Sequence, residues 1–254
     1  MVGTSQVKRR PADSEGAITE DERSPRLKWV TMALMRLYFK LFHQYEALGQ
    51  EHLPPSPPVL VITNHVSLLD VPAFALADKF VGSRLIAKES LLRTPIVKQI
   101  LYSWGAIPVA RDGRDSSALR GVLGALREGR LVAIAAEGTR NREGKLGETN
   151  PVLARLAIQA SASGIPLVPL AAVGTYECLP RGARLPRPGK VRVLIGPQFD
   201  LGYLKARPKD EAVREAQRVI HERLLVMTQS GLPIAPPVPR PAGAPTPVRA
   251  SPGD

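Results

Sequence analysis

Hydrophobic residues along the chain follow two different periodicities. Short apolar runs rich in β-branched residues predict strands, and they lie at residues 59–63, 84–87, 106–109, 131–136, 167–173 and 191–195. Helical spacing marks three other segments, defined by Leu119, Val122, Leu123 and Leu126, by Leu153, Leu156, Ala157 and Ala160, and by Val213, Ala216, Ile220, Leu224 and Met227. Because the two patterns alternate, we expect an α/β fold with a mostly parallel mixed sheet flanked by helices.

The segment over residues 27–45 has a pattern of its own, and we expect an N-terminal amphipathic helix there. Its residues are an apolar stripe of Val30, Leu34, Leu37, Tyr38 and Leu41 and, on another side, the cations Lys28, Arg36 and Lys40 together with Trp29, Met32 and Phe39. One interpretation is a core helix with a solvated edge. The other is an interfacial helix whose aromatic residues lie at the lipid headgroups while its cations meet anionic lipid.

Both ends of the chain lack a hydrophobic pattern. Residues 1–25 are polar and charged and residues 231–254 are rich in proline, so we expect disordered tails on either side of one domain at 26–230. No early apolar run resembles a secretory signal, and no run reaches the roughly 20 residues that cross a bilayer. Any membrane contact is therefore expected to be peripheral, at the cytoplasmic face of the cell membrane.

Charge and cysteine content restrict the partners. A formal charge of +12 and a pI near 10.3 favour polyanions, among them nucleic acid, an anionic membrane surface and phosphorylated small molecules. We expect no nucleic acid partner, because the sequence has no reading motif and no interleaving of aromatic with basic residues. The single cysteine, Cys178, cannot form an internal disulfide, and no Cys/His spacing predicts a zinc site. We expect a cytoplasmic protein that needs no metal or other cofactor.

The candidate chemistry lies after the first predicted strand, in Asn64-His65-Val66-Ser67-Leu68-Leu69-Asp70. Strand ends are where α/β proteins place reactive groups. His65 suits proton transfer near neutral pH, and a carboxylate at its far nitrogen would fix the tautomer. Five residues along a continuous helix turn two side chains about 140° apart, so we expect His65 before a helix and Asp70 in its first turn. The alternative is that Asp70 only caps a helix starting at Val71.

Three further blocks lie at predicted strand ends. They are Gly105-Ala106-Ile107-Pro108-Val109-Ala110-Arg111, Glu137-Gly138-Thr139-Arg140 and Ile165-Pro166-Leu167-Val168-Pro169-Leu170. With the His65 block, and in this order over residues 59–175, they resemble the four motifs of the 1-acylglycerol-3-phosphate acyltransferase family, within the glycerophospholipid acyltransferase superfamily. The resemblance implies a glycerolphosphate acyltransferase-like fold.

The resemblance also implies a role for each block. His65 is similar to the general base that deprotonates the acceptor hydroxyl, and Asp70 to the carboxylate that orients it, so that no acyl-enzyme forms. Ser67 is a weaker candidate for a nucleophile. Guanidinium groups suit phosphate, and the arginines resemble ligands of the acceptor phosphate. The implied substrate-binding residues are Lys88, Arg111, Glu137, Gly138, Thr139 and Arg140. For Glu137, an ion pair with Arg140 is a further possibility.

The implied reaction moves a fatty acyl group from acyl-CoA or acyl carrier protein to the free hydroxyl of lysophosphatidic acid, giving phosphatidic acid. The chain departs from the family pattern at Ala135-Ala136, where relatives commonly have Phe-Pro, and at 149–152, where Phe-Lys-x-Gly often follows. These departures leave open a different lysophospholipid or a lyso-aminolipid as acceptor. A non-catalytic lipid-binding homologue is the remaining alternative. The presence of all four residues His65, Asp70, Glu137 and Arg140 argues against it.

Overall fold

The computed structural model describes residues 24–77, 83–88, 92–109 and 115–234. The tails expected at 1–25 and 231–254 lie almost wholly outside these ranges, as does Arg111. Within them, no helix combines the length and the apolar composition needed to cross a bilayer.

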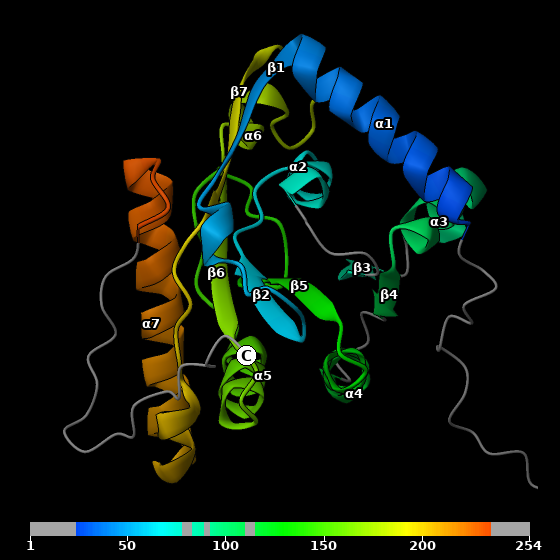
Figure 1. The fold of residues 1–254 in the computed structure, drawn as a ribbon. Coiled ribbons are helices and arrows are strands. Elements are labelled where there is room, and N and C mark those ends of the chain that lie inside the picture. The colour runs from blue at the N-terminus through cyan, green and yellow to red at the C-terminus, as the bar shows by residue number, and fades with distance from the viewer. Residues whose placement is uncertain (1–23, 78–82, 89–91, 110–114, 235–254) are drawn as a thin grey trace, which may run out of the picture.

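The core of the molecule is a seven-stranded sheet in the order β1-β7-β6-β2-β5-β3-β4 (Figure 1). Its strands are β1 (His43–Leu48), β2 (Val59–Thr63), β3 (Arg84–Lys88), β4 (Ala106–Val109), β5 (Leu131–Ala135), β6 (Leu167–Val173) and β7 (Gly189–Ile195). Every neighbouring pair is parallel except β6 and β7, which run antiparallel. The expected α/β fold with a mostly parallel mixed sheet is confirmed, and the carboxyl ends of β2, β5 and β6 meet at one edge.

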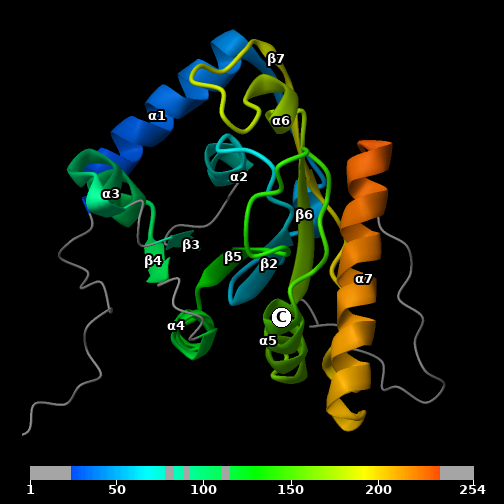
Figure 2. The same cartoon turned by 180° about the vertical axis from the view of Figure 1, so that it is seen from behind.

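Helices cover both faces of this sheet (Figure 1 and Figure 2). One face carries α4 (Asp115–Arg127), α5 (Pro151–Ala162), α7 (Lys209–Ser230) and the 3-10 turn η4 (Gly202–Ala206). The other carries α1 (Pro25–Phe42), α2 (Asp70–Ala77) and α6 (Thr175–Cys178), with α3 (Pro95–Ser103) beside α1 and the 3-10 turn η2 (Gln50–His52) after β1. In both views α2 lies between α1 and the sheet. We call these the α7 face and the α1 face.

The three helical stripes expected from the sequence form the α7 face. Apart from Met227, which packs with Ala171 and Leu194, their apolar residues pack with Leu60 and Ile62 of β2 in one cluster, to which α4, α5 and α7 all contribute. Helix α5 starts where Asn150 accepts the N–H of Val152 at 2.8 Å and Pro151 occupies the first turn. Residues 149–152, one of the departures from the family pattern, thus form the beginning of a helix.

The helix expected at 27–45 ends at Phe42, and residues 43–48 form strand β1, which the sequence pattern did not predict. Strand β1 pairs in parallel with β7, from His43 opposite Gly189 to Leu48 opposite Leu194. The helical prediction was wrong at residues 43–45, because so short a segment carries no periodicity of its own that could separate it from the adjoining helical pattern. The free edge of β7 supplies the hydrogen bonds that decide the conformation.

Candidate active site

The His65 loop begins where β2 ends, and Asn64 fixes that point. The buried Asn64 side chain donates to the carbonyl oxygen of Ala172 at 3.0 Å and accepts the N–H of the same residue at 2.8 Å. Thr63 is tied to the other neighbour, since its carbonyl oxygen accepts the N–H of Ala136 at 2.6 Å. The chain therefore reaches His65 from a position clamped between β6 and β5.

Asp70 and His65 are paired. Nδ1 of His65 lies 2.8 Å from Oδ2 of Asp70, and the same oxygen accepts the N–H groups of Val66 and Ser67, each at 2.8 Å. Asp70 is fully buried and begins α2, while His65 precedes the helix, as expected. The carboxylate thus bonds backward to the loop and not forward to the first turn of α2, which contradicts the simple capping interpretation.

The imidazole of His65 has one protected and one accessible side. Three hydrogen bonds hold the Asp70 carboxylate in place, so the Nδ1 side of the ring has a fixed orientation. The His65 side chain is 23% exposed, and it belongs to the lining of a cavity. Its Nε2 makes no hydrogen bond to any residue that the structure describes. This nitrogen is free to take a proton from a bound hydroxyl.

Glu137 holds the His65 loop from the end of β5. Its Oε2 accepts the backbone N–H of His65 at 3.0 Å, and its Oε1 accepts the N–H of Gly147 at 3.3 Å. Burial raises the pKa of Glu137 to about 7, although the hydrogen bonds from backbone N–H groups oppose that shift. Across the described ranges, no ion pair joins Glu137 to Arg140, so that possibility is not confirmed.

The block that follows Glu137 turns tightly back toward His65. Gly138 has φ of +72° and donates its N–H to the carbonyl oxygen of Ala135 at 3.1 Å. Asn141 then donates its N–H to the carbonyl oxygen of His65 at 3.0 Å. Thr139 is exposed and Arg140 is half-buried. Both directly precede Asn141, so they lie next to the loop that carries the candidate base.

Two of the expected phosphate ligands cannot be placed in the same way. Lys88 is the last residue of β3, and the structure does not describe its side chain. Arg111 lies outside the described residues. Both stay predictions, while His65, Asp70, Glu137, Gly138, Thr139 and Arg140 meet at the same edge of the sheet.

Ser67 is a structural residue of the loop. Its Oγ donates to the carbonyl oxygen of Leu179 at 2.9 Å and accepts the N–H of Leu69 at 3.2 Å. The residue is only 1% exposed. Both contacts tie Ser67 to its surroundings, and neither leaves its hydroxyl positioned as a nucleophile.

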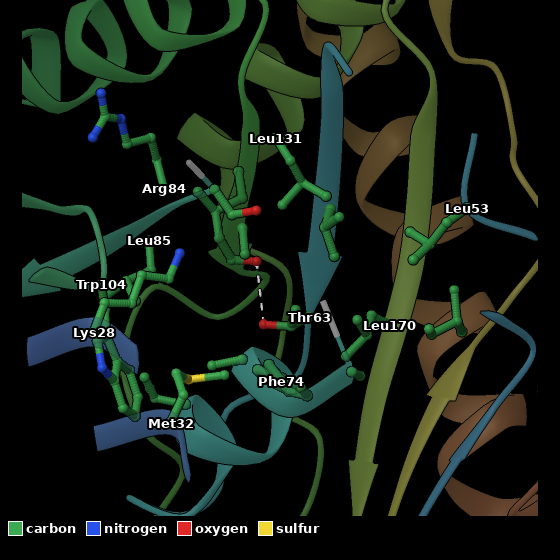
Figure 3. A pocket seen from close by; sticks show the side chains of 18 of the residues that line it. Lys28, Met32, Leu53, Thr63, Phe74, Arg84, Leu85, Trp104, Leu131 and Leu170 are labelled. Atoms are coloured by element: carbon green, nitrogen blue, oxygen red, sulfur yellow. Dashed lines mark hydrogen bonds between the residues drawn. The ribbon is translucent and has the colours of Figure 1, made fainter. Parts of the chain in front are cut away.

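A cavity of about 500 Å³ lies between the sheet, α1 and α2 (Figure 3). Apolar side chains make up most of its lining, among them Met32, Phe74, Leu85, Trp104, Leu131 and Leu170, and Lys28, Arg36 and Arg84 also reach it. The sequence analysis did not find this set, because its members come from elements that meet only in the folded chain. The one available signal was the position of Met32 opposite the apolar stripe of the N-terminal helix.

Helix α1 presents different residues to the cavity and to solvent. Met32 and Phe39 are buried, whereas Val30, Leu34, Leu37 and Leu41 are between 45% and 67% exposed. Four residues of the expected apolar stripe therefore face outward, while its fifth member, Tyr38, is half-buried and packs against the core. Whether the outer side of α1 contacts lipid or only solvent stays a prediction. A helix that is apolar on both sides needs a second partner for its outer stripe.

Comparison with known proteins places this geometry in a family. The Acyltransferase family model matches residues 44–173. A chloroplastic 1-acyl-sn-glycerol-3-phosphate acyltransferase of Brassica napus is 29% identical over 177 residues, which is 66% of this chain and 50% of that protein. A 1-acyl-sn-glycerol-3-phosphate acyltransferase of Borreliella burgdorferi is 33% identical over 123 residues, or 47% of this chain and 48% of that protein. The chain spans about half the length of each of these relatives.

A solved structure supports the same assignment. The crystal structure of the 1-acyl-sn-glycerophosphate (LPA) acyltransferase PlsC from Thermotoga maritima superposes with a TM-score of 0.60 at 25% identity and covers 78% of both chains. The region that the family model matches, residues 44–173, is slightly more than half of the 254 residues and contains His65, Asp70 and Glu137. The chain belongs to the Acyltransferase family.

Proposed function

We propose that the chain transfers a fatty acyl group from acyl-CoA or acyl carrier protein to the free hydroxyl of lysophosphatidic acid, forming phosphatidic acid. The observation that carries the proposal is the 2.8 Å contact between His65 and the buried Asp70, at the edge of a cavity of about 500 Å³. The two relatives described above are named for acyl transfer to 1-acyl-sn-glycerol-3-phosphate, which supports this acceptor.

The proposed step is direct transfer. Nε2 of His65 takes the proton of the acceptor hydroxyl as the oxygen attacks the thioester carbonyl carbon. Collapse of the tetrahedral intermediate breaks the carbon–sulfur bond, and the imidazolium returns the proton to the leaving thiolate. The buried Asp70 carboxylate, at 2.8 Å from Nδ1, stabilises the imidazolium between these two proton transfers.

The cavity is the proposed site for the acyl chain. Its apolar lining matches a hydrocarbon chain, and burial of each methylene group contributes about 0.8 kcal/mol. Met32 of α1, Phe74 of α2 and Leu170 of β6 surround it, and His65 shares the same lining. A chain bound there would hold its thioester close to the candidate base.

Arg140 is the proposed ligand of the acceptor phosphate. It is half-buried, and Asn141, the next residue, bonds to the carbonyl oxygen of His65 at 3.0 Å. Across the described ranges, no ion pair occupies its guanidinium. Lys88 and Arg111 are proposed as further ligands on the grounds of the family motifs. A phosphate held by these cations fixes the position of the nearby hydroxyl.

Helix α1 is the proposed membrane contact, at the cytoplasmic face of the cell membrane. The exposed stripe of Val30, Leu34, Leu37 and Leu41 has the length and composition of an interfacial helix, with Arg36 and Lys40 exposed on its flank. Because the opposite side of α1 lines the cavity, this placement puts the lipid-binding space next to the bilayer.

Release of free thiol from palmitoyl-CoA by the purified protein, with and without lysophosphatidic acid, tests the proposed function. We expect release that depends on the acceptor and disappears in His65→Ala. Normal turnover in that variant would contradict the role of His65. Absence of release from palmitoyl-CoA and from palmitoyl-acyl carrier protein would contradict the proposed function.

A different acceptor is a second candidate, and one observation favours it. Ala135 lines the cavity at the point where relatives commonly carry Phe, so the space beside His65 has a different shape from the family pattern. The same assay with other lysophospholipids and with a lyso-aminolipid separates the two candidates. Faster thiol release with one of these lipids than with lysophosphatidic acid would identify that lipid as the acceptor. The proposed chemistry would stay the same.

A further inference from the structure

A basic loop outside the proposed reaction lies between α6 and β7. Residues 179–192 contain five cations and no acidic residue, namely Arg181, Arg184, Arg187, Lys190 and Arg192. Lys190 and Arg192 both pair with Glu46, at 3.0 and 3.1 Å. The other three are exposed, and no residue that the structure describes forms an ion pair with them. We call residues 180–188 the arginine loop. It follows the region matched by the family model, which ends at residue 173.

The arginine loop also carries an exposed apolar residue. Leu185 is 79% exposed, more than any other large hydrophobic side chain in the described ranges. It stands between Arg184 and Arg187 in the sequence. A leucine flanked by arginines suits the surface of a bilayer, where guanidinium groups meet lipid phosphates and the apolar side chain enters the acyl region.

Hydrogen bonds hold the arginine loop in place. The N–H of Arg187 donates to the carbonyl oxygen of Cys178 at 2.7 Å, and the N–H of Ala183 donates to that of Pro180 at 3.1 Å. Leu179, at the base of the loop, accepts the hydroxyl of Ser67 at 2.9 Å. Leu179, the residue just before the arginine loop, is therefore bonded to Ser67 of the His65 loop.

The arginine loop continues the outer surface of α1. At its base, Cys178 and Leu179 pack in the same apolar cluster as Phe39 and Tyr38 of α1. Figure 2 shows the segment before β7 next to the end of α1 that joins β1. That end of the helix exposes Leu41 and Lys40. Both segments thus expose leucines together with cations.

We propose that the arginine loop binds the surface of an anionic bilayer and, together with α1, places the His65 loop against the membrane. A bilayer fits better than an acidic protein, because it offers Leu185 an apolar environment and the neighbouring α1 stripe exposes the same kind of side chain. The consequence for catalysis rests on the proposed function, whereas the binding of lipid does not.

Co-sedimentation of the full chain with vesicles tests the proposal. The vesicles are phosphatidylcholine with and without phosphatidylglycerol, and the test variant is Arg181→Gln/Arg184→Gln/Arg187→Gln. We expect about 100-fold weaker binding to the anionic vesicles, because each cation near the surface contributes about fivefold. Binding to neutral vesicles should stay unchanged. Added salt should weaken the binding of the wild-type chain to anionic vesicles toward that of the variant.

A matched variant controls for net charge. Lys205→Gln/Lys209→Gln/Arg214→Gln removes the same charge from exposed positions around η4 and α7, away from the arginine loop. We expect it to bind anionic vesicles within about threefold of the wild type. Leu185→Ser is a second test of the loop itself, and we expect it to weaken binding about 10-fold without loss of charge.

Three outcomes would overturn the proposal. One is unchanged vesicle binding in both loop variants, and another is an equal loss of binding in the matched control. The third is an arginine variant that binds vesicles as the wild type does but transfers more slowly from acyl carrier protein only. That result would make the loop a site for the acidic carrier protein. Vesicle binding is measured without turnover. An inactive wild-type chain would therefore contradict the proposed function, and the vesicle experiment would still test the arginine loop.

Discussion

The two faces of the sheet are built from the same strands and have opposite properties. On the α7 face, helices α4, α5 and α7 close over Leu60 and Ile62 to form one continuous buried cluster. On the α1 face, a cavity of about 500 Å³ remains, and α1 exposes its outer apolar stripe. The closed α7 face supplies stability by dense packing, while the open α1 face leaves apolar surface exposed, where we propose that a lipid chain and a membrane bind.

The largest expected effect concerns the edge of the open face. His65→Ala should lower turnover by about 10²- to 10⁴-fold, because it removes the proposed general base while the fold remains. His221→Ala on the α7 face is the control, since that histidine bonds to the carbonyl oxygen of Gly147 at 3.2 Å and should change turnover by less than about threefold. Steady-state kinetics of both variants measure the contrast. Equal losses of turnover in the two variants would contradict the assignment of the chemistry to the α1 face.

A change inside the closed face should act on stability alone. Leu224 of α7 is 0% exposed, so Leu224→Ala should lower the free energy of unfolding by about 2–5 kcal/mol. Phe74→Ala on the open face should lower the free energy of unfolding by a smaller amount, because that ring already borders the cavity. It should instead shift the preferred acyl chain length. Chemical denaturation and competition between acyl-CoA chain lengths measure the two effects. A larger stability loss from Phe74→Ala would show that the cavity is not open space.

The pH dependence of stability should sharpen the role of Glu137. Burial raises the pKa of this carboxyl from 4.5 to about 7, so its contribution to stability is fully present below pH 4.5 and is lost as the pH rises through 7. That contribution is at most about 3.5 kcal/mol, since one pKa unit corresponds to about 1.4 kcal/mol. Glu137→Gln cannot ionise, so the difference in unfolding free energy between wild type and variant should change by that amount between pH 4.5 and pH 7. A constant difference would contradict the assigned shift.

The smallest effect on stability is expected at the outer stripe of α1. Leu34 and Leu37 are 59% and 53% exposed, so Leu34→Ser/Leu37→Ser should change the unfolding free energy by less than about 1 kcal/mol. The same double variant should bind phosphatidylcholine vesicles at least 10-fold more weakly, because two apolar contacts with the bilayer are lost. Thermal melting and vesicle co-sedimentation measure these quantities. Unchanged vesicle binding would leave the open face without a membrane partner at α1.

The closed face was largely predictable from the sequence, and the open face was not. The helical stripes that contain Leu126, Leu156 and Leu224 are long and periodic, and all three residues are buried. Strand β1 escaped prediction because its conformation depends on the free edge of β7, far away in the sequence. For the same reason the contact of Glu137 with the backbone of His65, across 72 positions, could not be read from local spacing.

The sequence by itself determined the alternation of strands and helices, the pairing of His65 with Asp70 across a helix start, and the amphipathic character of α1. These features depend on neighbours within a few residues, where backbone geometry fixes which side chains meet. Only the tertiary structure decided which side of α1 faces outward, that a cavity remains beneath it, and that Leu179, before the arginine loop, bonds to Ser67 of the His65 loop. Those outcomes depend on how distant segments pack, and no periodicity along the chain encodes that packing.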